Sequence, residues 1–491
     1  MKRPTLDELE PQYDLIVVGG GITGAGILVE AARSGVKALL LEQGDFASGT
    51  SSGSSKLVHG GLRYLKSGQW RLTLESVRER ERLLHEAPDI VERQEFLMPV
   101  YAGAKPGKLA LRLGLWIYDR MATEAKSRWV EADEALALEP QLRKDGLLGG
   151  MLYEDARTND ARLVMSLVVE ACNAGAAARN YTRVEALLTA DGKVGGVKVR
   201  DETGATREVK AGVVIEATGA SAGRLQAGSI KLRPLRGSHF IFAADKLPVR
   251  RAVSWLHPRD RRPVFAYPWE GVTLYGTTDL DHEGSADVPP RMSAAESTYL
   301  IEGLAHQFPA LRLTAADAMS CFSAVRPVVA GGKATPSDES RESALWSSPG
   351  LVGVTGGKLT TFRITARQAL REASRQQLSL APSETDVTLF RAPTGTAMRT
   401  QTRAAEDISL AGTRYSVTKL RFSARHEQVL HLDDLMLRRT RLGLITPSGG
   451  RALLTKLQPV CRDELGWSDD RWREEERRYL ELWAANHAPP A

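Results

Sequence analysis

The chain has 491 residues, of which 42% are hydrophobic and 26% are charged. This composition is that of a globular protein, and the length predicts about two to three domains rather than one. The formal net charge of +6 is small for this length, and the basic residues are dispersed, which argues against nucleic acid as a partner. An anionic substrate, an anionic cofactor and an anionic membrane surface all remain open.

The cysteines and the apolar runs exclude further classes. Cys172, Cys321 and Cys461 form no CxxC pair and no even-numbered framework. We therefore expect neither disulfides nor a bound metal, as is typical of the reducing cytosol. The N-terminus lacks the apolar stretch of a signal peptide, and no uncharged run is long enough to cross a bilayer. The sequence predicts a soluble or peripheral protein.

The first elements form a strand, helix and strand unit. Residues 13–18 (YDLIVV) are an apolar run of strand length, a helical pattern continues to Gly35, and VKALLLE predicts a second strand that ends at Glu42. A right-handed crossover is expected between two such parallel strands. The sequence GGGITGAG joins the first strand to the helix.

Gly19, Gly21 and Gly24 have the G-x-G-x-x-G spacing of a dinucleotide-binding turn. The first glycine would make the tight turn, the second would let the backbone approach a pyrophosphate, and the third would let the helix pack closely. The N–H groups at the start of the helix, at Ile22 and Thr23, would face the phosphates. A glycine turn without a ligand is the alternative interpretation.

Glu42 is placed to accept hydrogen bonds from ribose hydroxyls, because it follows the second strand of the unit. A carboxylate here disfavours a 2′-phosphate. FAD or NAD is therefore favoured over NADP, and the spacing alone does not separate FAD from NAD.

The rest of the chain alternates helices, strands and loops. Helices are predicted over residues 71–85, 160–174 and 299–307, and strands in VGGVKVRD, in GATREVKAGVVIEATG, repeatedly through 232–278 and in MSCFSAVRPVV. A strand, a Gly-Gly turn and a long helix are then predicted in ALWSSPGLVGVTGGKLTTFRITARQALREA. From about Pro393 the chain becomes polar and Arg-rich, and we expect a separate helical piece there.

Two amphipathic segments each have two interpretations. Residues 105–121 mix Lys and Arg with Leu, Trp116 and Tyr118, so this segment could rest on an anionic lipid surface. The alternative is a helix whose apolar stripe packs into the protein. Near the C-terminus, Trp472, Tyr479, Leu480 and Trp483 share one helical stripe, for which core packing is the preferred interpretation.

A series of longer motifs resembles the FAD-dependent, respiratory-type glycerol-3-phosphate dehydrogenases. In chain order these are DLIVVGGGITGAG, TSSGSSKLVHGGLRYL, RERERLLHEAP, TNDARLV, ATGA, RGSHF, YGTTD, SAVRPV and GGKLTTFR. The resemblance covers about residues 13–373, and the family belongs to the wider D-amino-acid-oxidase-like flavoproteins. Ala324 stands where the family usually has glycine. The C-terminal region is similar to the family's helical cap chiefly in DLMLRRTRLGL.

The resemblance implies an α/β fold in which a Rossmann-like FAD-binding domain is interleaved with an α+β substrate domain that carries an antiparallel sheet. A small C-terminal helical cap follows. The expected segments are 13–75, 150–232 and 335–388 for the FAD-binding domain, 76–149 and 233–334 for the substrate domain, and 389–491 for the cap.

The resemblance also implies FAD as the cofactor, and no metal. Small residues in TSSGSSKLVHGGLRYL would let backbone N–H groups and hydroxyls approach the pyrophosphate and flavin. The implied contacts are Thr50, Ser51, Ser52, Ser55, Lys56, Leu57, His59, Val184, Ala217, Thr218, Gly219, Gly356, Gly357, Lys358 and Leu359. For His59 a structural turn histidine is the alternative.

By the same resemblance, Arg63 and Arg326 would bind the substrate phosphate, because two guanidinium groups can clamp one dianion. His239 would accept the hydroxyl proton as a general base. Lys358 could act in place of His239 or together with it, since its ammonium group could stabilise negative charge on the substrate oxygen or near the flavin. The alternatives are a surface salt bridge for each arginine and a packed core residue for His239.

Tyr64 and Thr361 are further candidates for the substrate pocket. Packing is the alternative for Tyr64, and a helix N-cap is the alternative for Thr361.

The implied reaction is oxidation of sn-glycerol 3-phosphate to dihydroxyacetone phosphate, with hydride transfer to flavin and electrons passed to a membrane quinone. The protein would be cytoplasmic and peripheral on the inner face of the membrane, with a second copy of the chain as a further partner. Three alternatives stay open: an oxidase that uses oxygen, a relative acting on a 2-hydroxy or amino acid, and a non-catalytic FAD-binding protein.

Overall fold

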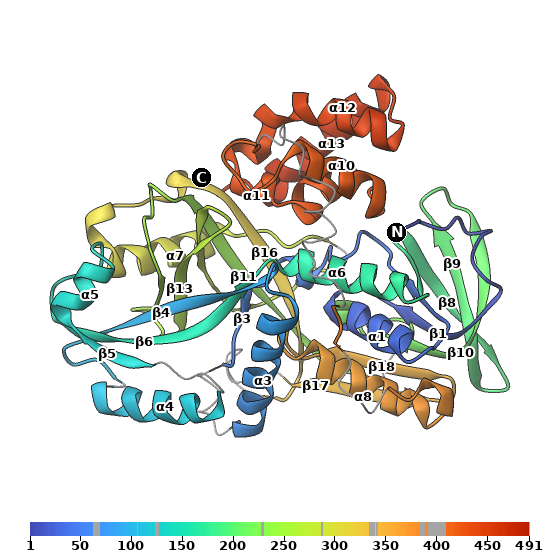
Figure 1. Cartoon of the computed structure of the whole chain (residues 1–491), viewed down its shortest axis with the longest axis horizontal. Helices are drawn as coiled ribbons and strands as arrows, with labels where there is room; N and C mark the ends of the chain where they lie inside the picture. Colours follow the sequence, from blue (N-terminus) through green and yellow to red (C-terminus); the bar gives the residue numbers. More distant parts are fainter. Residues whose placement is uncertain are drawn as a thin grey trace.

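The computed structural model describes residues 1–61, 69–105, 107–122, 127–226, 230–285, 288–332, 339, 342–382, 388–390 and 409–490. Two sheets lie side by side, each with its own helices, and the C-terminal helices lie above them in Figure 1. This two-sheet α/β architecture with a helical C-terminal region confirms the expected fold class.

The first sheet has eight strands, with the path β17-β18-β10-β1-β2-β7 and with β9 paired to β10 and β8 to β9. Its strands are β1 (Gln12–Val18), β2 (Ala38–Leu41), β7 (Ala177–Arg179), β8 (Thr182–Ala190), β9 (Lys193–Asp201), β10 (Thr206–Glu216), β17 (Ser343–Ser348) and β18 (Leu351–Gly356). The central pairs β18·β10, β10·β1, β1·β2 and β2·β7 are parallel. Parallel strands are buried on both faces, which explains the continuous apolar run in β1 and β2.

Helices α1 (Ile22–Arg33), α6 (Asp160–Asn173) and α8 (Phe362–Ser374) pack with this sheet. Helix α1 contacts both α6 and α8 and is buried from Gly24 to Ala32. A Cβ atom at Gly26 would lie 2.7 Å from the Phe362 ring, so the small residue permits this close packing. Burial on more than one side explains why α1 is apolar nearly all round.

The second sheet has ten strands, with the path β15-β11-β14-β13-β12-β4-β6-β3 and with β16 paired to β11 and β5 to β6. Its strands are β3 (Leu57–Val58), β4 (Val91–Tyr101), β5 (Arg128–Glu131), β6 (Leu147–Thr158), β11 (Leu232–Ala243), β12 (Ala252–Leu256), β13 (Pro263–Trp269), β14 (Val272–Gly276), β15 (Leu280–Asp281) and β16 (Ala318–Val329). Most pairs are antiparallel, whereas β12 pairs with β4 in parallel.

The helices between these strands are α3 (Trp70–Glu86), α4 (Lys108–Met121), α5 (Ala132–Leu138) and α7 (Ala294–Gln307). Helix α7 begins several residues before the predicted start at Tyr299, because Ser293 and Glu296 form a capping box there. Short 3₁₀ turns occur at Thr50–Ser52, Gly219–Ser221, Pro309–Leu311, Ala315–Asp317 and Leu378–Leu380.

Two pieces of the second sheet lie within segments that the sequence analysis assigned to the FAD-binding domain. These pieces are β3 and the part of β6 from residue 150 to residue 158. They belong to the second sheet because β6 pairs with β4 as far as Val91↔Thr158 and β3 pairs with β6 at Leu57↔Arg157. The whole of β6 therefore belongs to the second sheet, whereas the expected domain boundary between residues 149 and 150 divides this strand.

The C-terminal region, which we call the cap, comprises residues 409–490. It contains α10 (Val417–His426), the π-helix η7 (Asp434–Arg439), α11 (Leu442–Ile445), the 3₁₀ segment η8 (Pro447–Leu453), α12 (Leu454–Leu465) and α13 (Asp469–Asn486). Trp472, Tyr479 and Trp483 of α13 are buried, and the last two donate hydrogen bonds to the carbonyls of Gly449 and Gly443. The apolar stripe of α13 is therefore part of the core, as predicted.

Helix α4 divides its apolar residues between the protein and the solvent. Leu115 and Tyr118 are buried, whereas Leu109, Leu113 and Trp116 are 79%, 60% and 54% exposed. Among the residues that the structure describes, no helix combines the length and the apolar content needed to cross a bilayer.

Candidate functional site

The turn between β1 and α1 has the geometry of a dinucleotide-binding turn. Gly19 has φ 113°, and a Cβ atom there would lie 2.4 Å from the carbonyl oxygen of Ala217. A Cβ atom at Gly24 would lie 1.9 Å from the carbonyl oxygen of Gly19. Gly21 is the N-cap of α1, and Ile22 is the first helical residue. The backbone N–H groups at this helix start are thus positioned for an anionic group.

The carboxyl ends of β1, β2 and β10 border a cleft that opens to solvent. Ligands of parallel α/β sheets bind at this edge. Four of the predicted cofactor-binding residues line the cleft, namely Gly19, Glu42, Val184 and Thr218. The sequence patterns did not indicate the polar lining residues Gln43, Thr182, Arg183, Ser221 and Arg224. Gln43 follows β2, Thr182 and Arg183 begin β8, and the other two follow β10, so only their place near strand ends could have indicated them.

The carboxylate of Glu42 is fixed at the edge of this cleft. Its Oε2 accepts the N–H of Gly20 at 2.6 Å, and its Oε1 accepts the N–H of Gly44 at 2.8 Å. Burial raises the pKa of Glu42, while these two backbone donors oppose the rise. Because each carboxylate oxygen has more than one lone pair, hydroxyl donors can still bind.

The end of β10 contributes the next predicted group, Ala217 to Gly219. Ala217 packs against Gly19, as described above, and the carbonyl of Gly219 accepts a hydrogen bond from the Thr355 hydroxyl at 2.9 Å. This bond joins the end of β10 to the end of β18. The two strand ends therefore form one continuous edge beside the cleft.

The loop from Thr50 to His59 connects the two sheets and is not slack chain. Ser51 Oγ accepts the N–H of Ile22 at 2.9 Å, and the Thr50 hydroxyl donates to the carbonyl of Val325 on β16. A Cβ atom at Gly53 would lie 2.5 Å from the Ala324 methyl group. Gly53 thus leaves room for the alanine that replaces the usual glycine of the SAVRPV motif.

Lys56 was expected to contact the cofactor, but its ammonium group is fully buried in an ion pair. Its Nζ lies 3.0 Å from Asp160 Oδ2 and donates to the Ser52 carbonyl at 2.7 Å. Burial lowers the pKa of Lys56 to about 7, and the charge of Asp160 opposes this shift. Only the backbone of Lys56 is left for a cofactor contact, and Leu57 lies in β3 with its side chain in the core.

His239 on β11 lies against the same loop. Its Nε2 is 2.9 Å from Ser55 Oγ, and its ring stacks on Phe322 with centroids 4.7 Å apart. Its Nδ1 has no hydrogen-bond partner in the described part of the chain. Burial and then the charges of Arg326 and Lys56 lower the pKa of His239 well below its usual value. The imidazole is therefore neutral near pH 7 and can accept a proton.

Arg326 on β16 is held in one orientation. Its Nη1 donates to Asp279 Oδ1 at 2.8 Å and its Nη2 to Thr277 Oγ1 at 3.1 Å. The guanidinium lies over Gly237, where a Cβ atom would be 2.3 Å from Nη2. The sequence analysis missed Asp279, although it is the last residue of the YGTTD motif.

A second glycine turn lies between β18 and α8. Gly356 and Gly357 both have φ 75°, a conformation that favours glycine. Lys358 follows them, and its Nζ donates to Ser76 Oγ of α3 at 3.4 Å. Leu359 packs against the core of the first sheet.

The start of α8 completes this turn. Thr361 is the N-cap residue, but its side chain makes no capping hydrogen bond within the described residues. The hydroxyl of Thr360 donates to the carbonyl of His59 at 3.5 Å. The glycine turn is thereby joined to the end of the Thr50–His59 loop.

The predicted residues thus form two groups. One lies at the cleft around Gly19 and Glu42, and the other lies around His239 and Arg326 on the second sheet. The Thr50–His59 loop contacts both groups. Arg63 and Tyr64, which were expected to complete the substrate pocket, lie outside the described residues.

Comparisons with known proteins agree with this geometry. Residues 14–368 match the FAD dependent oxidoreductase family, and residues 394–472 match the C-terminal domain of alpha-glycerophosphate oxidase. The second match covers most of the cap, in which the motif DLMLRRTRLGL was the chief similarity to the family's helical cap.

Two curated relatives are named aerobic glycerol-3-phosphate dehydrogenase. The chain is 38% identical over 371 residues to that of Bacillus subtilis, a match covering 74% of this chain and 66% of the relative. It is 36% identical over 376 residues to that of Staphylococcus aureus, with 74% and 67% covered. The chain spans about two thirds of the length of these relatives.

The structure is also similar to that of the glycerol-3-phosphate dehydrogenase from Bacillus halodurans complexed with FAD, with a TM-score of 0.71 and 27% identity over 97% of this chain and 94% of that chain. The glycine turn, the fixed acid at the cleft edge and the hydroxyl-rich loop of the present chain fit an extended anionic dinucleotide. The chain belongs to the FAD dependent oxidoreductase family, and its cofactor is FAD.

Proposed function

We propose that the chain oxidises sn-glycerol 3-phosphate to dihydroxyacetone phosphate. The observation that carries this proposal is the placement of a neutral histidine, His239, beside a fixed arginine, Arg326, next to the loop that also contacts the dinucleotide turn. Oxidation of a secondary alcohol needs an acceptor for the hydroxyl proton and one for the hydride. Bound FAD would supply the acceptor for the hydride that leaves C2 of the substrate.

The residues of the first sheet would hold the cofactor. We assign the pyrophosphate to the start of α1 and to the hydroxyl of Ser51, and the ribose to Glu42. The lining residues Val184 and Thr218 would contact the adenosine part. The Gly356-Gly357 turn, which carries no side chain, would let its backbone approach the flavin.

Arg326 would bind the substrate phosphate, together with Arg63. A guanidinium group suits a phosphate because it offers parallel N–H donors in one plane. Asp279 and Thr277 keep this group in place before substrate binds, which lowers the entropic cost of binding. A second arginine favours a phosphate dianion over the single carboxylate of an amino acid or 2-hydroxy acid.

His239 would accept the proton of the C2 hydroxyl. Its Nε2 faces Ser55 Oγ, so a substrate hydroxyl that takes the place of this contact would meet the same nitrogen. The ring is held by stacking on Phe322, which fixes its direction. Lys358, anchored near Ser76, would stabilise negative charge that develops on the substrate oxygen or on the cofactor.

We further propose that electrons leave to a quinone in the membrane, with the protein bound peripherally on its cytoplasmic face. The support is the exposed apolar stripe of α4, formed by Leu109, Leu113 and Trp116. Arg112 and Arg120 lie on the same helix, and the Arg120 guanidinium lies 4.8 Å from the Trp116 ring centroid. An apolar stripe with flanking cations suits an anionic lipid surface. Oxygen is the alternative acceptor.

Substrate choice is tested by turnover with an artificial electron acceptor. Glycerol 3-phosphate should support reduction of the acceptor, whereas glycerol, lactate and glycine should support little or none. Equal rates with glycerol and glycerol 3-phosphate would contradict the proposed phosphate-binding site. Rapid oxygen uptake without any added acceptor would favour an oxidase over a quinone-linked dehydrogenase.

A further inference from the structure

A short segment of the cap, Asp434–Leu442, inserts three arginines into the FAD-binding part of the molecule. The side chains of Arg438, Arg439 and Arg441 are buried, and η7, which carries the first two, is buried along its whole length. A buried cation is costly unless it is paired, so the partners of these arginines show what the segment does. We call it the arginine segment.

Arg438 and Arg439 bind one carboxylate, that of Asp45. Arg439 makes a bidentate contact, with Nη1 to Oδ2 and Nη2 to Oδ1 both at 2.7 Å, and Arg438 Nε donates to Oδ2. Burial alone would raise the pKa of Asp45, but the two arginines hold it well below its usual value. Asp45 follows Glu42 closely in the loop after β2 that borders the cleft.

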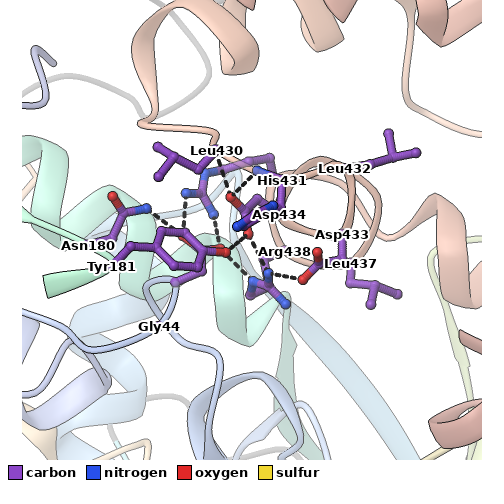
Figure 2. A network of polar contacts seen from close by, with 12 residues as sticks. Gly44, Asn180, Tyr181, Leu430, His431, Leu432, Asp433, Asp434, Leu437 and Arg438 are labelled. Atoms are coloured by element: carbon purple, nitrogen blue, oxygen red, sulfur yellow. Dashed lines mark hydrogen bonds and ion pairs between the residues drawn. The ribbon is translucent and has the colours of Figure 1, made fainter. Parts of the chain in front are cut away.

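This loop is held from two sides. Figure 2 shows Asn180 and Tyr181 pointing toward the arginine segment, where the Tyr181 hydroxyl donates to Asp434. Asn180 Nδ2 donates to Asp45 Oδ1 at 3.0 Å, and the Tyr181 N–H donates to the Gly44 carbonyl at 2.8 Å. Residues 42–45 are thus fixed between the cap and the start of β8.

The same loop reaches the dinucleotide turn. The N–H of Ala47 donates to the Gly20 carbonyl at 3.0 Å, and Glu42 accepts the Gly20 N–H. Displacement of Asp45 would therefore move both the acid that faces the ribose and the turn that faces the pyrophosphate.

Arg441 reaches a second loop through one carboxylate. Its Nη2 donates to Asp160 Oδ1, and its Nε donates to Asn159 Oδ1 at 3.1 Å. The other oxygen of Asp160 accepts the Ser54 hydroxyl at 2.7 Å and the Lys56 ammonium at 3.0 Å. The positive charges of Lys56 and Arg441 hold the pKa of Asp160 low despite its burial. Asp160 therefore links the cap to the Thr50–His59 loop.

We propose that the arginine segment is a cofactor clamp. Arg438, Arg439 and Arg441 are positioning residues: through Asp45 and Asp160 they hold the two loops that border the FAD site. Docking of the cap and binding of FAD then stabilise each other, because each orders the same two loops, and this coupling is reciprocal. This proposal requires that the chain binds FAD, and it holds whichever substrate the chain oxidises.

The test measures FAD affinity in the deflavinated full-length chain by titration with FAD and flavin fluorescence. Arg439→Met and Arg441→Met should each raise the dissociation constant of FAD by about tenfold or more, which lies within the usual range of coupling between sites. Arg441→Lys should recover much of the affinity, because it restores a cation beside Asp160. Arg477→Met is the matched control, since Arg477 is exposed on α13 and pairs with Glu481.

The variants must be folded, as judged by circular dichroism, and at saturating FAD their substrate KM should equal that of the unchanged chain. An unchanged FAD dissociation constant in folded Arg439→Met and Arg441→Met would overturn the clamp. A general loss of stability would instead appear as a lower Tm of the deflavinated Arg439→Met and Arg441→Met variants than of the deflavinated Arg477→Met control.

Hydrogen exchange on the unsubstituted chain gives an independent answer if these variants do not fold. Addition of FAD to the deflavinated chain should slow exchange of the backbone amides of residues 434–445, although these residues belong to the cap. The amides at the exposed end of α12 serve as the internal reference. Equal exchange of the arginine segment with and without FAD would overturn the proposal.

Discussion

At the scale of single residues, His239 connects the second sheet to the Thr50–His59 loop by a hydrogen bond. It is placed on the second sheet, yet it contacts Ser55 of the Thr50–His59 loop, which also contacts the dinucleotide turn through Ser51. The motif RGSHF could indicate the residue but not its neutral state, because that state results from burial and from the charges of Arg326 and Lys56. Both charged partners lie far from His239 in the sequence.

Replacement of His239 by Asn keeps a polar group of similar size beside Ser55 but removes the base. We expect the rate of flavin reduction by glycerol 3-phosphate to fall by roughly 100- to 10,000-fold, the usual contribution of a general base. FAD content, read from the absorbance spectrum, should stay near that of the unchanged chain. A rate within a few-fold of the unchanged chain would mean that another group takes the proton.

The lowered pKa of His239 also predicts a pH profile. The base acts in its neutral form, so activity is lost as pH falls through the pKa of the residue. Because that pKa lies well below the ordinary value of 6.5, the acidic limb of kcat/KM should lie below pH 6.5. A limb at or above pH 7 would contradict a buried neutral histidine as the base.

Arg326 is predicted to act on substrate binding and not on cofactor binding. Arg326→Ala removes charge-assisted hydrogen bonds to the phosphate, and KM for glycerol 3-phosphate should rise roughly 10- to 100-fold. FAD content should not change, because Arg326 contacts Asp279 and Thr277 in the connection between β14 and β15, away from the dinucleotide turn. An unchanged KM would remove Arg326 from the phosphate site.

At the scale of elements, the sequence predicted the helices, strands and turns whose positions depend on residues close to them in the chain. The β1-turn-α1 unit, α3, α6 and the Gly-Gly turn before α8 all lie where their glycine and apolar patterns placed them. The expected domain boundary between residues 149 and 150 divides β6, whose pairing with β4 is a long-range contact that local patterns do not indicate. The π-helix η7 was not predictable either, since its buried Arg438 and Arg439 pair with Asp45, a residue distant in the chain.

The contacts of the Lys56 side chain were likewise not predictable from the sequence. The motif TSSGSSKL indicated a cofactor loop, and the hydroxyls of Thr50 and Ser51 do bridge structural elements there. The Lys56 side chain instead pairs with Asp160, within the TNDARLV motif, for which the sequence offered no role. A resemblance places a loop in the fold but does not say where each of its side chains points.

The packing of α1 predicts a steric requirement at Gly24. In Gly24→Ala the new Cβ atom would lie 1.9 Å from the Gly19 carbonyl oxygen, so the turn must shift and FAD content should fall. Gly114→Ala is the control, because Gly114 lies in α4 with no described atom within 4 Å of a Cβ atom there. This control should raise stability slightly, by about 0.5–1 kcal/mol, since alanine favours helix more than glycine does. Full FAD content in Gly24→Ala would contradict the turn geometry.

The exposed stripe of α4 predicts binding to lipid. Replacement of both Leu113 and Trp116 by Glu should reduce sedimentation with anionic vesicles, because apolar contact is lost and like charge is added. The same change at Leu148, which is also exposed, is the control. Equal sedimentation of the double variant and the unchanged chain would show that α4 does not contact the membrane.

At the scale of the whole molecule, the cap contacts both sheets (Figure 1). The arginine segment reaches the FAD-binding part, while the end of α13 reaches β16 through His487 and Cys321, whose backbone N–H donates to the His487 carbonyl at 2.8 Å. Sequence patterns predicted a helical region here. They could not place it, because its contacts are made by residues distant in the chain.

The end of α13 predicts how stability depends on pH. Burial lowers the pKa of His487 to about 4 from its ordinary value of 6.5. The unfolded chain therefore binds more protons between these pH values, so the stabilisation is complete above pH 6.5 and is lost as pH falls toward 4. Tm should decrease over this range, and His487→Gln should make the decrease smaller. A slope that is identical in this variant would contradict the assignment.

The central proposal is that glycerol 3-phosphate reduces the FAD of this chain. The most direct measurement is anaerobic addition of glycerol 3-phosphate to the purified holoprotein while the flavin absorbance is followed. We expect the absorbance to bleach and dihydroxyacetone phosphate to form in an amount equal to that of the flavin reduced. Flavin that stays oxidised with glycerol 3-phosphate, but is bleached by a 2-hydroxy acid or an amino acid, would contradict it.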